Sequence, residues 1–331
     1  MKIGLTYNLR PTAPRGPHVP DDADEEFDKP QTIDAIANVL RGLGHTVILL
    51  GDGREFLEKV LADKPDFVFN YAEGQGISRS REARVPAVLD MLGIPYTGSD
   101  PLTMSVTLDK DCAKKLVAHA GVAVPHGFAL ERDAPIASIP SDALRFPLVV
   151  KPAWEGSSKG IRGKSLVHQA SELPAVVDAL RRDHPQTILL EEFIAGDELT
   201  VGLYGNGEPS VLGILRIVPK VGAERFLYSL EVKRDYHNHV TFQCPPRLPQ
   251  EVLDRVGSAA QTAFRALGCR DIARVDFRVR AGVPYFLEVN PLPGLHPIDS
   301  DLVMIAGHVG WSYEKLVATI VHEALKRCGV I

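Results

Sequence analysis

The chain has 331 residues, of which 45% are hydrophobic and 24% charged, and its formal net charge is -5. This length predicts two or three units around separate cores, and the composition excludes a wholly disordered chain. No dense block of Lys and Arg is present, so we expect neither nucleic acid nor a membrane surface as a partner. The first residues lack the apolar core of a signal peptide, and no apolar run approaches the roughly 20 residues that cross a bilayer. We therefore expect a cytoplasmic enzyme.

Strand and helix signals alternate over the first hundred residues. Apolar runs predict strands at residues 2–7, 46–50 and 67–70. Apolar side chains at helical spacing predict helices between and after them, the first of which ends at Gly44. This alternation predicts a parallel sheet covered by helices, and hence an α/β unit, to which we assign residues 1–101.

An acidic, proline-containing segment over residues 8–30 interrupts this pattern. It carries Asp21, Asp22, Asp24, Glu25, Glu26 and Asp28. Acidic runs are usually hydrated, so we favour a solvated insertion over a lid or an amine-binding rim, and we assign no chemistry to it.

Helix and strand signals continue to the end of the chain in two further units. The unit over residues 102–186 has a helix signal near residues 109–120, an apolar run that ends at Lys151, and a helix near residues 171–182. The unit over residues 187–331 starts with the strand ILLEEF. It continues with a helix near residues 251–267, strands at residues 272–279 and 284–290, and a helix near residues 313–327.

The segment VVKPAWEGSSKGI has the features of a phosphate-binding loop. An apolar strand places Lys151 at its end, and the small residues Gly156 to Gly160 follow at once. Such residues let backbone N–H groups surround phosphate oxygens, while the lysine adds positive charge. Taken alone, an ordinary turn is the more frequent explanation of such a segment, and the Walker pattern is absent.

The segment LLEEFIAGDELTV is a candidate for nucleoside recognition. Backbone groups of Glu192, Phe193 and Ile194 can pair with an adenine edge, with Glu191 accepting from the exocyclic amine and Glu198 from ribose hydroxyls. An exposed acidic edge strand explains the same residues equally well.

The segments ARVDFRV and PYFLEVNPLPG carry the strongest signal. Read as two strands, they offer Asp276, Glu288 and Asn290 as hard oxygen ligands for Mg²⁺. Burying these carboxylates among apolar neighbours without a cation is costly, which disfavours a purely structural role. Arg274 shares the face of Asp276 and can neutralise an anionic intermediate, and the N–H of Gly294 can donate to the same oxyanion. A salt bridge for Arg274 and a simple turn at Gly294 are the alternatives.

In this order and spacing, the three segments resemble the ATP-grasp superfamily, and within it the D-alanine:D-alanine ligase family. The family's hallmarks include K-P-x-x-x-G-S-S-x-G and R-x-D followed by E-x-N-x-x-P-G. The resemblance runs over nearly the whole chain and implies a three-domain architecture, with ATP held between two mixed α/β domains. YTGSDPLTMSVTLDK is similar to the family's Y-x-G-S…DK segment, which adds Lys110. YSLEVKRDY is similar to its mobile loop, which adds Lys233.

The resemblance implies that a substrate carboxylate attacks the γ-phosphate of ATP, and that an amine then displaces phosphate from the acyl phosphate. It implies one or two Mg²⁺ ions, with Mn²⁺ as an alternative, small amino-acid or peptide substrates, and a homodimer. Catalytic roles fall to Ser157, Lys233, Arg274 and Gly294, and metal binding to Asp276, Glu288 and Asn290. Nucleotide binding falls to Lys110, Lys151, Gly156, Ser158, Glu191, Glu192, Phe193, Ile194 and Glu198.

The chain departs from the family where substrates are expected. NYAEGQGISRSRE replaces H-G…E-D-G, and in it Glu73, Arg79 and Arg81 are candidate contacts for the first substrate. LHPIDSD replaces the segment that grips the second substrate's carboxylate, and it offers Asp299, Ser300 and Asp301. Because these anions repel a carboxylate, we predict an acceptor other than D-alanine, with a cationic amine as one candidate.

Other functions remain open on these residues. An amino-acid or dipeptide ligase with another acceptor shares the first half-reaction. A non-catalytic ATP-binding regulator is disfavoured, since binding alone does not require Arg274, Asp276, Glu288 and Asn290 together. No G-x-G-x-x-G follows the first strand, which disfavours a dehydrogenase.

Overall fold

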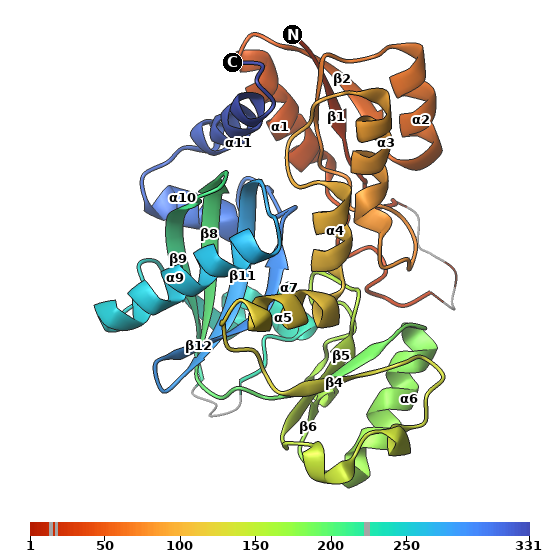
Figure 1. The fold of residues 1–331 in the computed structure, drawn as a ribbon, viewed down its shortest axis with the longest axis vertical. Coiled ribbons are helices and arrows are strands. Elements are labelled where there is room, and N and C mark those ends of the chain that lie inside the picture. The colour runs from red at the N-terminus through yellow and green to blue at the C-terminus, as the bar shows by residue number, and fades with distance from the viewer. Residues whose placement is uncertain (13–15, 17–18, 222–225) are drawn as a thin grey trace.

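The computed structural model describes residues 1–12, 16, 19–221 and 226–331. The described strands form a sheet in each of three successive parts of the chain (Figure 1). The first sheet has the order β2-β1-β3 and is parallel, with β1 (Lys2–Thr6), β2 (Thr46–Gly51) and β3 (Phe67–Phe69). Helices α1 (Pro30–Gly42), α2 (Gly53–Ala62) and α3 (Arg84–Leu92) follow these strands. The predicted alternation and parallel sheet are confirmed.

The second sheet is antiparallel and has the order β4-β7-β5-β6. Its strands are β4 (Gly127–Leu130), β5 (Leu148–Pro152), β6 (Leu166–Val167) and β7 (Ile188–Glu192), and helix α6 (Leu173–Asp183) packs against it. Short 3-10 helices lie at Ile136–Ser138, Ser141–Ala143, Gly163–Ser165 and Ala170–Glu172. The sequence predicted a boundary after residue 186, which would assign β7 to the third part of the chain. In the structure β7 pairs with β4 and β5, so the second sheet extends to Glu192.

The third sheet has the order β10-β9-β8-β11-β12. It contains β8 (Asp197–Gly205), β9 (Ser210–Pro219), β10 (Val240–Gln243), β11 (Asp271–Arg280) and β12 (Val283–Asn290). Helix α9 (Gln250–Ala266) and helix α5 (Lys110–His119) pack on it in one core, in which Ala113 and Val117 meet Phe264 and Val289. Although α5 precedes the second sheet in the chain, its apolar face belongs to the third.

The remaining helices connect the parts. Helix α4 (Pro101–Leu108) leads into α5, and the short helices α7 (Leu230–Arg234) and α8 (Tyr236–His239) precede β10. Helix α10 (Asp301–His308), which was not predicted from the sequence, is followed by α11 (Tyr313–Arg327). Within the described residues, no helix combines the length and the apolar character needed to cross a bilayer.

One core joins the two ends of the chain. Ile3 and Leu5 of β1 and Ile36 of α1 lie in the same buried cluster as Leu316 and Val317 of α11. Figure 1 shows α11 beside α1, with both termini near the first sheet. Because each fully buried Leu or Ile contributes about 1.5–3 kcal/mol, this shared core ties the first part of the chain to the last.

Candidate active site

Two cavities meet between the three parts of the chain. The first has a volume of about 420 Å³ and the second about 120 Å³. Both are lined by Ser157, Tyr228, Lys233, Arg274 and Asp301, so they open onto each other. Residues predicted from widely separated segments are therefore brought to one place.

The second cavity gathers most residues predicted to bind the nucleotide or the metal. Its walls come from β5, the loop after it, β7, β8, β11 and β12. They include Lys151, Ser158, Glu191, Glu192, Phe193, Ile194, Glu198, Asp276 and Glu288. The other predicted residues of these two sets, Lys110, Gly156 and Asn290, line the first cavity instead.

The carboxylate of Glu191 pairs with two lysines at this cavity. Its carboxylate lies 2.9 Å from Lys151 Nζ and also accepts from Lys114 Nζ. Burial opposes charge on this carboxyl, yet the two ammonium groups lower the pKa of Glu191 to about 2. The structure thus gives Glu191 the role of holding Lys151 at the end of β5, whereas acceptance from an adenine amine stays a prediction.

Glu198 is paired with Arg278, a residue that was not among the predicted site residues. Arg278 Nη1 donates to Glu198 Oε2 at 3.1 Å, and its guanidinium lies 4.6 Å from the centroid of the Phe193 ring. Arg274, Asp276 and Arg278 alternate along β11, so they share one face of the strand. The same two-residue period that selected Arg274 would have identified Arg278.

The candidate metal ligands lie on paired strands. Asp276 stands opposite Glu288 and Arg274 opposite Asn290 in the β11–β12 register. Arg274 donates to both oxygens of Asp276, at 3.1 and 2.9 Å, and Lys110 Nζ lies 3.2 Å from Glu288. Burial, reinforced by Glu288, raises the pKa of Asp276 to about 6. In the described chain, no group of three or more His, Cys, Asp or Glu side chains is arranged to hold a metal, so this set rests on two carboxylates and an amide.

Local structure explains the position of Lys110. Asp109 caps α5, its side chain accepting from the N–H of Cys112, and this fixes the first turn of the helix. Lys110 is the first residue of that helix and is buried at 5% exposure. Its ammonium donates to the carbonyl of Glu155 and faces Glu288, so it links the loop after β5 to β12.

The residues predicted to bind substrate line the first cavity, with the exception of Arg79 and Arg81. Glu73, Gly294, Asp299 and Ser300 all line it. Asp301 Oδ2 lies 3.1 Å from Arg274 Nη1, and Tyr236 donates to Asp299 at 3.1 Å. The N–H of Gly294 makes no hydrogen bond to a described residue and remains available to a ligand.

The loop after β5 adopts a strained backbone at the junction of the cavities. Ser157 and Ser158 have φ angles of 49° and 60°, in the left-handed region that residues other than Gly rarely adopt. Such residues cost about 1–3 kcal/mol each and concentrate at functional sites. Their position beside Lys233 and Arg274 is consistent with the predicted loop function.

Two backbone N–H groups of this loop are used by the acidic segment. Glu26 accepts from the N–H of Gly156 at 2.5 Å, and Asp22 accepts from the N–H of Gly160 at 2.9 Å. A carboxylate therefore occupies the N–H of Gly156 in this structure, and the role of Gly156 in nucleotide binding stays a prediction. We call residues 19–28 the acidic strap. Residues 13–15 and 17–18, which also belong to the predicted acidic insertion, lie outside the described residues.

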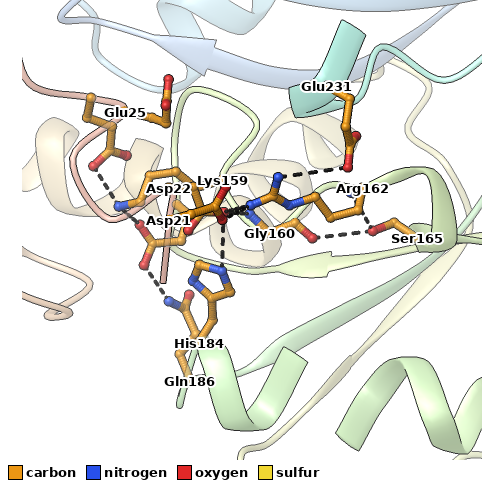
Figure 2. A network of polar contacts seen from close by, with 12 residues as sticks. Asp21, Asp22, Glu25, Lys159, Gly160, Arg162, Ser165, His184, Gln186 and Glu231 are labelled. Atoms are coloured by element: carbon orange, nitrogen blue, oxygen red, sulfur yellow. Dashed lines mark hydrogen bonds and ion pairs between the residues drawn. The ribbon is translucent and has the colours of Figure 1, made fainter. Parts of the chain in front are cut away.

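The acidic strap is folded onto the loop rather than hydrated. Figure 2 shows Asp21 and Asp22 directed at Arg162, with His184 on the other side of Asp22. On the other side of the loop, Glu26 is 9% exposed and meets Arg81 and Lys159. The favoured interpretation of a solvated insertion is wrong, because partners far along the chain neutralise its charges.

Arg81 has a structural partner in place of a substrate. It lies in a 3-10 helix, η1 (Arg81–Ala83), is 1% exposed, and donates through Nη2 to both oxygens of Glu26 at 2.8 and 2.9 Å. Its Nη1 donates to the carbonyl of Trp154 at 2.7 Å. The prediction that Arg81 contacts a substrate is therefore not supported, because all of these contacts are internal.

Comparison with known proteins identifies similar chains. Residues 116–322 match the family model described as D-ala D-ala ligase C-terminus. A D-alanine–D-alanine ligase of Desulforudis audaxviator is 35% identical, over 88% of this chain and 92% of that protein. The uncharacterized protein y4sG of Sinorhizobium fredii is also 35% identical, over 89% of this chain and 87% of that protein. The crystal structure of the Bacillus anthracis D-alanine–D-alanine ligase complexed with ATP superposes with a TM-score of 0.77 at 25% identity, covering 100% of this chain and 99% of that one.

Proposed function

Because the chain belongs to the D-alanine–D-alanine ligase family, we propose that it joins an amino-acid carboxylate to an amine through an acyl phosphate. It is an ATP-dependent ligase that forms a carbon–nitrogen bond. The observation that carries the proposal is the junction of the two cavities at Ser157, Lys233 and Arg274. Nucleotide in the second cavity and substrates in the first would meet at these residues. The homodimer implied by the family resemblance stays a prediction.

Each half-reaction has residues suited to it. Phosphoryl transfer depends on positioning and charge neutralisation, for which Lys110 and Lys151 supply buried ammonium groups. The tetrahedral intermediate of the second half-reaction carries an oxyanion, which Arg274 and the N–H of Gly294 would stabilise. Burial and the positive charge of Arg274 lower the pKa of Lys233. The negative charge of a bound phosphate would favour the protonated form of this lysine.

The donor set at the β11–β12 pair fits a magnesium ion. Carboxylate and amide oxygens are the ligands that Mg²⁺ prefers, and it completes its octahedron with phosphate oxygens and water. Asp276 and Glu288 stand opposite each other in the β11–β12 pair, and alternation places Asn290 on the same face of β12 as Glu288. Asp276, Glu288 and Asn290 would hold one or two ions, with Mn²⁺ as an alternative, and the metal would neutralise charge on the triphosphate.

We further propose that the acceptor is an amine other than D-alanine. Asp301 and Asp299 place carboxylates on the wall of the first cavity, and Arg274 is already engaged by Asp276 and Asp301. An acceptor with its own carboxylate would meet repulsion at Asp301, whereas a cationic or uncharged amine would not.

Phosphate release from ATP and Mg²⁺ tests this function. We would measure it first with D-alanine alone and then with a panel of amino acids, dipeptides and amines. Glu288→Ala should abolish release, and Glu208→Ala, which alters an exposed carboxylate on the surface, should not. Efficient release with D-alanine alone would refute the acceptor proposal. Tight ATP binding without release across the panel would refute the ligase proposal and favour a regulator.

A further inference from the structure

The junction of the two cavities holds one side chain that can accept a proton. Of the residues that the structure describes, those that line both cavities are Ser157, Tyr228, Lys233, Arg274 and Asp301. Burial and the charge of Asp301 raise the pKa of Tyr228, so its phenol stays protonated. Arg274 is a permanent cation, a bound phosphate favours the protonated form of Lys233, and the hydroxyl of Ser157 is not basic at neutral pH. The carboxylate of Asp301 is the base that remains.

Asp301 lies beside the cation that would stabilise the oxyanion. Its Oδ2 lies 3.1 Å from Arg274 Nη1. Its Oδ1 makes no hydrogen bond or ion pair with any residue in the described part of the chain, and the side chain is 21% exposed. One carboxylate oxygen is thus held in place, while the other can face a ligand in the cavity.

The loop before α10 keeps Asp301 close to the N–H of Gly294. Ser300 Oγ accepts from the N–H of His296 at 2.8 Å, and a Cβ at position 294 would lie 3.0 Å from the same oxygen. Gly294 therefore packs against Ser300, the residue that precedes Asp301. The predicted oxyanion donor and the carboxylate are fixed in one short loop.

The other acidic and titratable groups around Asp301 do not share its position. Asp299 accepts from Tyr236 at 3.1 Å and lines the first cavity but not the second. Glu198 lines the second cavity but not the first. Lys233 of α7 and Tyr236 of α8 interact electrostatically with Asp301. Among these carboxylates, only that of Asp301 reaches the place where nucleotide and substrates would meet.

The second half-reaction needs a base when the acceptor is cationic. An ammonium group has no lone pair, so it must lose a proton before its nitrogen can attack an acyl carbon. The acceptor proposed above is a cationic or uncharged amine, and a cationic one is attracted to Asp301. Attraction would bring the ammonium group to the carboxylate next to Arg274.

We propose that Asp301 is the catalytic base that deprotonates the ammonium group of the acceptor. This assignment rests on the proposed ligase function. One N–H bond breaks and an O–H bond forms at Asp301, which leaves a lone pair on nitrogen. Nitrogen then bonds to the acyl carbon, the carbon–oxygen bond to phosphate breaks with its electron pair on phosphate, and a second proton passes from nitrogen to that phosphate. Asp301 returns its proton to water.

Nucleophiles that differ in charge test this role. Hydroxylamine is largely uncharged at neutral pH, alaninamide is mostly protonated, and propylamine is almost wholly protonated. We would measure phosphate release and product formation with each, at saturating ATP and with the best donor among L-alanine, D-alanine and β-alanine. The proteins are the wild type, Asp301→Asn and Asp301→Glu, with Asp254→Asn on the exposed face of α9 as the matched control.

We expect the loss in Asp301→Asn to grow with the basicity of the nucleophile. The kcat with propylamine should fall at least about a hundredfold, since general base catalysis contributes about 10²–10⁴-fold. The kcat with hydroxylamine should fall far less, because hydroxylamine already has its lone pair. At a pH where alaninamide is uncharged, its loss should shrink, and Asp301→Glu should restore part of the kcat with propylamine.

Other outcomes would overturn the assignment. A loss confined to KM would show that Asp301 only attracts the acceptor. An equal loss with all three nucleophiles would place the effect on Arg274 and the oxyanion instead. A wild type that uses hydroxylamine but neither amine has no base for an ammonium acceptor. If the wild type forms no hydroxamate with any donor, the ligase function itself is refuted, and the role of Asp301 falls with it.

Discussion

At the scale of single residues, Arg274 sits between carboxylates on both sides. Asp276 accepts two hydrogen bonds from it, and Asp301 lies 3.1 Å away at the start of α10. A guanidinium engaged in this way stays fixed in position, which suits stabilisation of an oxyanion. The same pairing leaves it little capacity to bind the carboxylate of an acceptor. Acceptor choice should therefore depend on Asp301.

Replacing Asp301 with Asn should shift the acceptor preference towards amines that carry a carboxylate. The change removes the negative charge while keeping the shape, so kcat/KM for alanine relative to alaninamide as acceptor should rise about tenfold, equivalent to about 1.4 kcal/mol. Steady-state phosphate release with each acceptor measures the ratio. Asp254→Asn on the exposed face of α9 is the control, and an unchanged ratio in Asp301→Asn would remove Asp301 from acceptor selection.

Glu82 should make the stability of the ligand-free protein depend on pH. Burial, which outweighs the attraction of Arg81 and Lys110, raises the pKa of Glu82 to about 7, and repulsion from Glu26 and Glu155 acts in the same direction. The unfolded value is about 4.3, so between these values the folded protein binds more protons and loses stability as pH rises. Glu82→Gln should match the wild type at pH 4 and be more stable by up to about 3 kcal/mol at pH 8. Denaturant unfolding at both pH values measures this, and a difference that is constant with pH would contradict it.

At the scale of elements, the acidic strap and the loop after β5 form one polar unit. Asp22 and Glu26 accept from the N–H groups of Gly160 and Gly156, and Arg162 pairs with the strap from the loop side. The loop is tied on its other side to α7, where the N–H of Leu230 donates to the carbonyl of Ile161 at 2.9 Å. The strained serines are thus held by contacts from both sides, which is the condition for strained residues to persist.

Removing Arg81 should release the strap. In Arg81→Met, Glu26 and Glu155 lose a buried counter-charge, and breaking such a pair costs about 3–5 kcal/mol. We expect a loss of that size in the free energy of unfolding, together with faster hydrogen exchange at the Gly156 and Gly160 amides. Arg84→Met, in which the altered arginine is exposed on α3, is the matched control. Unchanged exchange in Arg81→Met would show that the strap does not depend on Arg81.

At the scale of the whole molecule, the first and last parts of the chain share a core and a buried polar junction. Asp271 is 0% exposed and accepts from the N–H of Gly98 at 2.7 Å and from Asn206 at 3.0 Å. Arg327 of α11 also donates to Asp271, at 3.0 and 2.9 Å. One carboxylate therefore joins the first part of the chain, the third sheet and the last helix.

Asp271→Asn should lower the unfolding temperature of the whole molecule rather than destabilise one part alone. Asn tolerates the φ angle of 63° at this position but removes the charge that Arg327 requires, for a cost of about 3 kcal/mol. We expect thermal unfolding at a lower temperature and still in a single transition, because the shared core couples the ends. Calorimetry measures this against Asp254→Asn. Two separate transitions would show that the ends unfold independently.

The sequence by itself determined many of the helices and strands, although not α10, and the grouping of residues along each strand. Periodicity is a local property, so the period of two in ARVDFRV and FLEVN already placed Arg274 with Asp276 and Glu288 with Asn290. The helix over Tyr313–Arg327 and the parallel first sheet followed from the same kind of pattern. The order and spacing of the motifs were also sufficient to identify the family, because each motif is a short run of residues that can be recognised in the sequence.

Only the tertiary structure decided which charges are paired and which are not. Arg81 and Glu26 are 55 positions apart, and nothing in either segment indicates the other. The sheet to which β7 belongs and the burial of the acidic strap also depend on distant segments meeting. A charged residue's role is set by the partners and the desolvation it acquires on folding, and neither is a property of its neighbours in sequence.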